Sequence, residues 1–284
     1  MTTEIILILI AVIVAPLLGG LISGIDRKLT AWFQSRQGPP ITQGFFDVAK
    51  LFGKEKMAAN PWIIFCAWVY LVAAALSVVL FFLQSDLLLI FFVQAIGAVF
   101  MVIGAMSVPS PYSQVGAQRE LIQILTYEPL LILVFVSIYL ATGSFQIDQI
   151  MQVEQPLLFK LPLMFIVLGY ALTIKLRKSP FDFSTSHHGH QELVKGVLTE
   201  YSGPFLGLVE VAHWYETILV LGLCALFWST NILAMIALLV VTYLAEIIID
   251  NTMARMTWRW MLKYVWSVGL ALSFVNLIWL YAKV

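Results

Sequence analysis

The sequence contains few charged residues and almost no cysteine. Charged residues make up 11% of the 284 residues, against about 25% in a typical soluble domain. The 16 basic and 16 acidic residues cancel, so the chain lacks the positive excess that nucleic-acid binding uses. The two cysteines, Cys66 and Cys224, lie in apolar stretches, and no C-x-x-C motif occurs. These absences exclude a disulfide scaffold, a thiolate zinc site and an iron–sulfur cluster held by this chain alone.

Motifs that bind nucleotides or build hydrolytic sites are also missing. The sequence has no P-loop, no G-x-G-x-x-G fingerprint and no nucleophile elbow. His213 is the only histidine inside a long apolar stretch, so a pair of histidines cannot hold a haem within the bilayer. If electron transfer drives this protein, the electrons travel in a partner.

Apolar residues are the abundant class, at 61% of the chain with a mean hydropathy of +0.93. Because about 20 apolar residues suffice to cross a bilayer as a helix, the sequence predicts an all-α, polytopic membrane protein. The eight predicted spans are 5–24, 61–83, 87–108, 127–143, 157–176, 205–228, 232–250 and 262–281. The first has no basic leader and no small-residue cleavage site, so we expect it to be retained rather than cleaved as a signal peptide. The spans leave no room for a separate soluble domain, and we expect one integral membrane domain over 1–284.

The basic residues are distributed unevenly between the two sides of the membrane. Fourteen of the 16 lie in or beside loops that share one side if the spans alternate, and only Lys160 and Lys283 fall on the other. The positive-inside rule therefore places both termini outside. The loops expected in the cytoplasm are about 25–60, 109–126, 177–204 and 251–261.

The first of these loops contains an amphipathic pattern that ends at Gly53. Its apolar residues recur at helical spacing: Ile41, Phe45, Val48, Ala49 and Phe52. The pattern predicts a helix that lies in the membrane interface or under a partner protein.

Titratable residues inside the predicted spans are the clearest functional signal. A charge in hydrocarbon costs several kcal/mol, so such residues are rare and usually functional. Glu210, His213 and Glu216 follow one another at intervals of three in the sixth span, which favours a proton path. Glu246 and Asp250 are four apart near the end of the seventh span. For Glu246 a path and a merely structural place both stay open, whereas for Asp250 we expect pairing with a neighbour or a position at the membrane interface.

The loop 177–204 contains three histidines, His187, His188 and His190. Their spacing lacks the i, i+4 presentation of a helical metal site, and no cysteine accompanies them. Because imidazole titrates near neutral pH, a proton relay or a docking contact is favoured over a metal site.

Four groups of motifs resemble a known family. They read Gln34-Ser-Arg36-Gln-Gly38-Pro39 with Asp47-x-x-Lys50-Leu51; Gly116-Ala117-Gln-Arg119-Glu120 with Tyr127-Glu128; Pro180-Phe181-Asp182; and Glu192-Leu193-Val194 with Glu200-Tyr201-Ser202-Gly203. In order, spacing and number of spans, the chain resembles the membrane protein known as subunit 1 of complex I. It equally resembles the counterparts of that protein in group 4 membrane-bound NiFe hydrogenases.

The sequence departs from the complex I pattern near Pro180. Complex I usually has a glutamate and an arginine before Pro-Phe-Asp, where this chain has Lys175 and Lys178. It then has an acidic run, much of which Thr185, Ser186 and the histidines replace here. This segment resembles the energy-converting (Ech-type) hydrogenase branch, which implies hydrogen evolution from reduced ferredoxin rather than quinone reduction.

The resemblance implies roles for the matched residues. Docking of a hydrophilic hydrogenase arm would involve Arg36, Asp47, Lys50, Arg119 and Glu120. A proton inlet and path would use Asp182, Glu192, Glu200, Glu128, Glu210, His213, Glu216 and Glu246, of which Glu210, Glu216 and Glu246 are placed by local reasoning alone.

The resemblance also implies partners and a location in a prokaryotic cell membrane. The partners would be the large NiFe and small Fe–S hydrogenase subunits, a ferredoxin-like Fe–S subunit and an antiporter-like membrane subunit. The NiFe centre and the 4Fe–4S clusters would lie in those partners, with no cofactor in this chain, and the coupled ion could be H⁺ or Na⁺. Two alternatives stay open: the equivalent subunit of a formate hydrogenlyase or of a proton-pumping NADH or ferredoxin dehydrogenase, and an independent secondary transporter. A secondary transporter would be expected to contain inverted repeats, and the two halves of this sequence show no convincing similarity.

Overall fold

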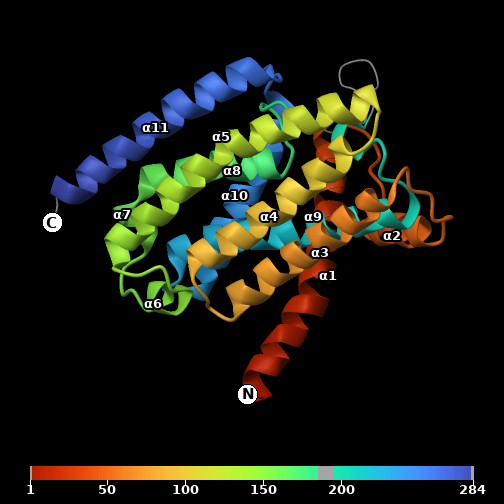
Figure 1. Cartoon of the computed structure of the whole chain (residues 1–284). Helices are drawn as coiled ribbons and strands as arrows, with labels where there is room; N and C mark the ends of the chain where they lie inside the picture. The colour runs from red at the N-terminus through yellow and green to blue at the C-terminus, as the bar shows by residue number, and fades with distance from the viewer. Residues whose placement is uncertain (1, 185–194, 283–284) are drawn as a thin grey trace. The chain divides into compact units, whose positions relative to one another are not determined.

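The computed structural model describes residues 2–184 and 195–282 (Figure 1). Within these residues the regular elements are helical, apart from one isolated bridge between Asp86 and Gln146, which confirms the all-α prediction. The α-helices are α1 (Thr2–Phe33), α2 (Gln43–Phe52), α3 (Pro61–Phe82), α4 (Leu87–Met106), α5 (Pro111–Thr142), α6 (Ile147–Met151), α7 (Leu157–Lys160), α8 (Pro162–Lys175), α9 (Gly203–Ala225), α10 (Ile232–Thr252) and α11 (Trp258–Ala282). Seven helices of the described chain are long and apolar enough to cross a membrane: α1, α3, α4, α5, α9, α10 and α11.

The fifth predicted span, 157–176, is not one helix but two, α7 and α8. Leu161 leaves the helical region, with φ −129° and ψ 49°. Pro162 causes the break, because proline has no N–H to donate and disfavours helical geometry in the residue before it. The 14 residues of α8 extend about 21 Å, less than the hydrocarbon thickness of about 30 Å.

Most of the segment 109–126, which we expected to be a loop between spans, is helical, because α5 begins at Pro111 and continues through it. The buried face of this first part of α5 consists of Ser113, Gly116, Ala117 and Glu120. These residues have helical spacing, but they are small or polar, so a search for apolar periodicity misses the helix.

The chain forms two compact units, each assembled from separate segments. Unit 1 comprises Met1–Leu83, Ile90–Leu121 and Phe183–Ile218, and unit 2 comprises Gln84–Leu89, Ile122–Asp182 and Leu219–Val284. Helices α4, α5 and α9 each contribute to both units.

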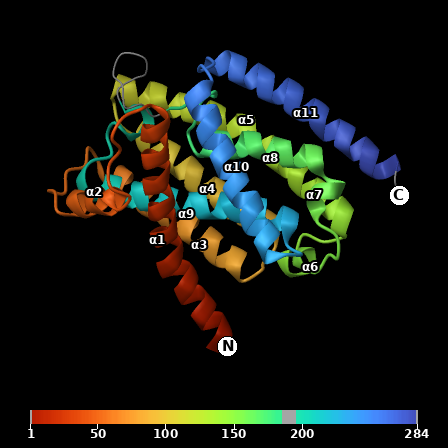
Figure 2. The ribbon, with the colours of Figure 1, turned by 180° about the vertical axis from the view of Figure 1, so that it is seen from behind.

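Close helix packing in unit 1 depends on glycine. A Cβ atom at Gly19 on α1 would collide with the backbone of Trp214 on α9, and one at Gly116 on α5 with the backbone at Gly196. Small residues at such crossings are typical of membrane helices, whose association relies on close van der Waals contact. Figure 2 shows α1 passing α9 and α3.

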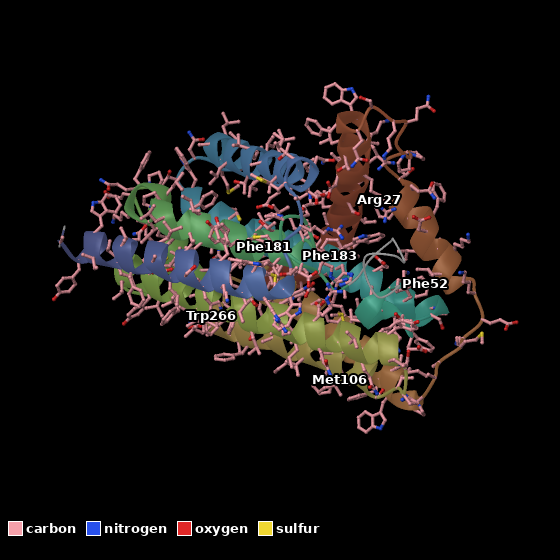
Figure 3. All side chains as sticks on the ribbon, turned by 90° about the horizontal axis from the view of Figure 1, so that it is seen from above. Arg27, Phe52, Met106, Phe181, Phe183 and Trp266 are labelled. Carbon is pink, nitrogen blue, oxygen red and sulfur yellow. The ribbon has the colours of Figure 1, made fainter. Side chains whose placement is uncertain are left out.

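The predicted amphipathic helix is confirmed as α2, which ends at Phe52 with Gly53 as its C-cap. The ring of Phe45 in α2 packs against the ring of Trp214 in α9, with 5.1 Å between the ring centroids. Arg27 near the end of α1 forms a 3.1 Å ion pair with Asp47 of α2; Figure 3 labels Arg27 and Phe52 on these two helices. The helix therefore packs on its own unit through Phe45 and Val48, while Phe46 stays 65% exposed.

In unit 2, α8 packs along α11 (Figure 2). The buried Asn276 of α11 compensates for the break before Pro162. Its Oδ1 accepts hydrogen bonds from the backbone N–H groups of Leu163 and Met164, at 2.9 and 3.3 Å, and its Nδ2 donates to the Lys160 carbonyl at 3.3 Å. Backbone groups freed inside a bilayer need such a partner because no water is available there.

Gly104→Ala tests the close packing of helices in unit 1. A Cβ atom there would collide with the Tyr201 hydroxyl and lie 2.8 Å from Cβ of Cys66. Because overpacking a tight interior forces its neighbours to shift, we expect a loss of about 1–3 kcal/mol in stability, seen as a lower melting temperature in detergent. Gly169→Ala on α8 is the matched control, since nothing lies within 4 Å of its Cβ position. Equal melting temperatures for both variants would contradict the tight packing of Gly104 against Tyr201 and Cys66.

Candidate functional site

Four polar side chains from three membrane helices of unit 1 form a group that we call the midplane cluster: Tyr70 of α3, Gln94 of α4, and His213 and Glu216 of α9. Gln94 Nε2 donates a hydrogen bond to Glu216 Oε1. The Tyr70 and His213 rings meet edge to face, with 5.6 Å between centroids. Gln94 and Glu216 are 7% and 9% exposed. Two of the predicted path residues, His213 and Glu216, therefore contact other helices.

The cluster lies near the middle of the spans that contribute to it. At 1.5 Å per residue, Tyr70, Gln94 and His213 lie roughly 14, 10 and 15 Å from the first residues of α3, α4 and α9. Half the hydrocarbon thickness is about 15 Å. The group is thus placed where a polar side chain is most costly and where an ion path needs one.

Glu210 does not join this cluster. The six-residue separation of Glu210 and Glu216 turns the helix by about 600°, which leaves the two side chains about 120° apart. Glu210 therefore lies on a different face of α9 from Glu216. It is half-buried and makes no hydrogen bond or ion pair with the described part of the chain. The three-residue path stays a prediction, in which Glu210 lies on a different face of α9 from Glu216.

Tyr70 and Gln94 were missed in the sequence because both side chains are neutral. Gln94 has a recognisable signal, however, since it is the one amide within the apolar run Leu87–Met106. Its Oε1 atom is buried and has no hydrogen-bond partner in the described residues. A buried amide oxygen without a partner is a costly arrangement, which marks Gln94 as a candidate site residue.

Unit 2 contains a second buried group, here called the α10 cluster: Thr173, Lys178, Tyr243, Glu246 and Asp250. Thr173 Oγ1 donates to Glu246 Oε1 at 3.0 Å. The Lys178 ammonium lies 4.8 Å from the centroid of the Tyr243 ring. Lys178 and Asp250 are near enough to act on the charge of Glu246, and Lys178 and Glu246 are each 4% exposed. Glu246 thus faces a buried cation.

The motif Pro180-Phe181-Asp182 is fixed to the end of α10. Asp250 Oδ1 accepts from the Ser179 N–H at 2.8 Å, and Ser179 Oγ donates to the Met253 carbonyl at 2.9 Å. The N–H of Met256 donates to the Pro180 carbonyl at 2.7 Å. The expected pairing role of Asp250 is therefore seen. Asp182 itself is buried, and its carbonyl accepts from Gln123 Nε2 at 2.8 Å.

Glu128 lies within α5 beside a lysine of α8. It is half-buried, and Lys175 is close enough to interact with it electrostatically. The Lys175 ammonium also lies 5.1 Å from the centroid of the Tyr127 ring. The two lysines that replace the family's usual residues before Pro180 thus each have an acidic side chain nearby.

The docking candidates differ in how accessible they are. Arg36 and Lys50 are exposed, and Arg36 Nε donates to Gln34 Oε1 at 2.8 Å. Asp47 already forms an ion pair with Arg27, and its Oδ1 accepts a hydrogen bond from Gln43 Nε2 at 2.9 Å.

The other two docking candidates lie on the first part of α5. Arg119 is half-buried, and Glu120 is buried and accepts a hydrogen bond from Ser184. Lys50 and Arg36 are therefore the docking candidates most open to a partner.

The motif Glu200-Tyr201-Ser202-Gly203 packs against the first loop. Ser202 Oγ donates to the Met57 carbonyl at 2.7 Å, and the half-buried Glu200 precedes it. The Tyr201 hydroxyl donates to the Met101 carbonyl at 3.0 Å. Burial raises the pKa of Tyr201 above its usual range, so the phenol remains a neutral donor.

Four of the candidate residues, Glu192, His187, His188 and His190, lie outside the described residues. Within residues 2–184 and 195–282, no group of three or more His, Cys, Asp or Glu side chains is arranged to hold a metal ion.

Comparisons with known proteins place the chain among respiratory membrane subunits. Residues 4–281 match the family model described as NADH dehydrogenase. Hydrogenase-4 component C of Escherichia coli is 30% identical over 274 residues, covering 86% of this chain and 85% of the relative. Formate hydrogenlyase subunit 4 of Escherichia coli is 28% identical, covering 93% and 94%. NADH-ubiquinone oxidoreductase chain 1 of Arabidopsis thaliana is 28% identical, covering 76% and 73%.

A solved structure has the same fold. It is a chain of the membrane-bound sulfane sulfur reductase, an archaeal respiratory membrane complex, with a TM-score of 0.84 and 24% identity. The match covers 98% of this chain and 99% of that one.

Proposed function

The chain belongs to the NADH dehydrogenase family, and from this premise we propose that it anchors a ferredoxin-dependent, hydrogen-evolving NiFe hydrogenase and couples its electron transfer to ion translocation. Membership makes the chain a multi-pass membrane subunit of a complex I-like respiratory or hydrogenase complex. The family resemblance predicted from the motifs is therefore confirmed. The type of complex and the ion path are the proposal.

Two features support the hydrogenase assignment. Hydrogenase-4 component C and formate hydrogenlyase subunit 4 align over most of the chain. In addition, Lys175 and Lys178 stand where the quinone-reducing branch usually has a glutamate and an arginine. The partners expected are the hydrogenase large and small subunits, a ferredoxin-like Fe–S subunit and an antiporter-like membrane subunit.

The midplane cluster is the observation on which the proposed ion path rests. A purely structural anchor has no need of a carboxyl group at mid-membrane, where an ionised side chain is strongly disfavoured. In our proposal Glu216 takes up and releases the coupled ion, H⁺ or Na⁺. The Gln94 amide holds the Glu216 carboxyl in place, and His213 lies one helical turn away as the next titratable group.

The buried acids of unit 2 would respond to the charge of the docked arm. A change in charge at the arm that shifts a carboxyl pKa by one unit corresponds to about 1.4 kcal/mol. Buried groups sense such a change more strongly than exposed ones because water screens it less. We assign this role to Glu246 and Glu128, each beside a lysine. The resemblance to the family adds Asp182, Glu192 and Glu200 as the proposed inlet.

Purification in mild detergent and assays in oriented vesicles test the proposal. We expect a NiFe large subunit and Fe–S subunits to copurify. Reduced ferredoxin, which cannot cross a membrane, should drive hydrogen evolution and ion uptake in inside-out vesicles and not in right-side-out ones. This result also requires the predicted orientation, with the long loops in the cytoplasm. A chain that purifies alone and transports a solute, or a complex that evolves no hydrogen from ferredoxin, would contradict the proposal; activity with formate, NADH or quinone instead identifies one of the alternative complexes.

A further inference from the structure

A cavity of about 630 Å³ opens at the C-terminal end of α1, within unit 1. Its walls combine apolar, aromatic and basic side chains: Ile25, Leu29, Ile41, Trp32, Lys28 and Arg36. Ile25, Lys28, Leu29 and Trp32 follow one another at spacings of three and four, so one face of α1 forms a wall.

Two close backbone contacts shape this cavity. A Cβ atom at Gly24 on α1 would collide with the Ile41 carbonyl. A Cβ atom at Gly38 would lie 2.8 Å from Cβ of Ala31 and 3.2 Å from Cα of Lys28. The segment from Gly38 to Ile41 is thus pressed against α1, and the opposite wall is fixed rather than formed by a loose loop.

The cavity lies where α1 leaves the hydrocarbon. The uncharged run Ile5–Ile25 extends about 30 Å as a helix, the thickness of the hydrocarbon core. Charged residues begin directly afterwards, at Asp26. Trp32 is 75% exposed, and tryptophan is enriched at the level of the lipid headgroups.

The charge in the cavity has one sign. Lys28 and Arg36 line it, and none of the described residues in its walls is acidic. Lys28 makes no ion pair or hydrogen bond with any residue that the structure describes, and the hydrogen bond that Arg36 makes to Gln34 uses Nε. The neighbouring Arg27 differs, since it is paired with Asp47 outside the cavity. The cavity therefore suits an anionic ligand.

We propose that this cavity binds one anionic phospholipid. Its phosphate lies between Lys28 and Arg36, because a guanidinium and an ammonium together match a phosphate group. One acyl chain follows Ile25 and Leu29 along α1 into the hydrocarbon. The apolar walls select a lipid over free phosphate, and this use of Arg36 replaces its docking role.

Native mass spectrometry of the purified complex, titrated with phosphatidylglycerol, tests this site. The variant Lys28→Gln/Arg36→Gln should bind the lipid about 30-fold more weakly, as expected from removing two basic residues near a membrane surface. The matched control Lys54→Gln/Lys56→Gln removes two exposed lysines of the same loop and should bind as the unmodified protein does. Phosphatidylcholine should bind more weakly than phosphatidylglycerol, and inorganic phosphate should not compete.

Three results would overturn the proposal. Unchanged phosphatidylglycerol binding by the Lys28→Gln/Arg36→Gln variant means that the lipid binds elsewhere. Loss of hydrophilic subunits with unchanged lipid binding means that the two cations dock a protein. Competition by inorganic phosphate means that the cavity is an anion site without lipid selectivity. None of these results bears on ion coupling, so the failure of this proposal is distinct from that of the proposed function.

Discussion

Glu216→Gln should abolish ion translocation while the complex still assembles. Glutamine keeps the size of the side chain and can still bond to Gln94, but it cannot take up and release a proton or neutralise a cation. The measurement is ion uptake by inside-out vesicles during ferredoxin-driven hydrogen evolution. We expect uptake at background level, with hydrogen evolution either slowed or uncoupled from it.

Two further variants make this test specific. Gln94→Leu removes the donor to Glu216 Oε1 and should lower uptake by about tenfold or more, because a hydrogen bond to a charged group contributes at least about 1.5 kcal/mol. Glu154→Gln, an exposed residue between α6 and α7, makes the same chemical change outside the cluster and should have no effect. Unchanged uptake in Glu216→Gln would remove the midplane cluster from the path.

Lys178→Met should cause the largest loss of stability. Removing one partner of a buried, oppositely charged pair leaves the other charge uncompensated and costs about 3–5 kcal/mol. Glu246 is the residue left in this state, and its Oε2 atom already has no hydrogen-bond partner in the described residues. We expect a markedly lower melting temperature and a reduced yield of assembled complex.

A second substitution that also removes the acidic side chain should rescue this defect. Lys178→Met/Glu246→Leu removes both charges, and such replacements of buried ion pairs are often neutral or stabilising. Lys263→Met, at an exposed lysine of α11, is the control for loss of a positive charge. If the double variant is as unstable as Lys178→Met alone, the two side chains do not form an energetic pair.

Most of the helices could be predicted from the sequence because apolar length is a direct signal of a membrane span. Gly53 likewise marked the end of α2. The two errors have local causes. Pro162 was visible in the sequence, but its effect was outweighed by the continuous apolar composition around it. The first part of α5 buries Ser113, Gly116 and Glu120, and such residues give no hydrophobic pattern.

The candidate site was predictable only in part, because charge draws attention to acids and not to their neutral partners. His213 and Glu216 were identified, whereas the contacts with Tyr70 and Gln94 depend on how three helices pack. Helical periodicity already separates Glu210 from Glu216 by about 120°, but which of these faces meets α3 and α4 depends on how the helices pack. Pairing of Lys178 with Glu246 requires two segments that are 68 residues apart, and no local pattern relates them.

Asn276 restricts how unit 2 can change shape. Its amide satisfies three backbone groups at the break between α7 and α8. Sliding α8 along α11 would expose those groups to lipid, where nothing replaces the lost bonds. We therefore expect α8 and α11 to shift as one rigid element during turnover, so that any rearrangement of this half of the molecule takes place at the joints flanking that element.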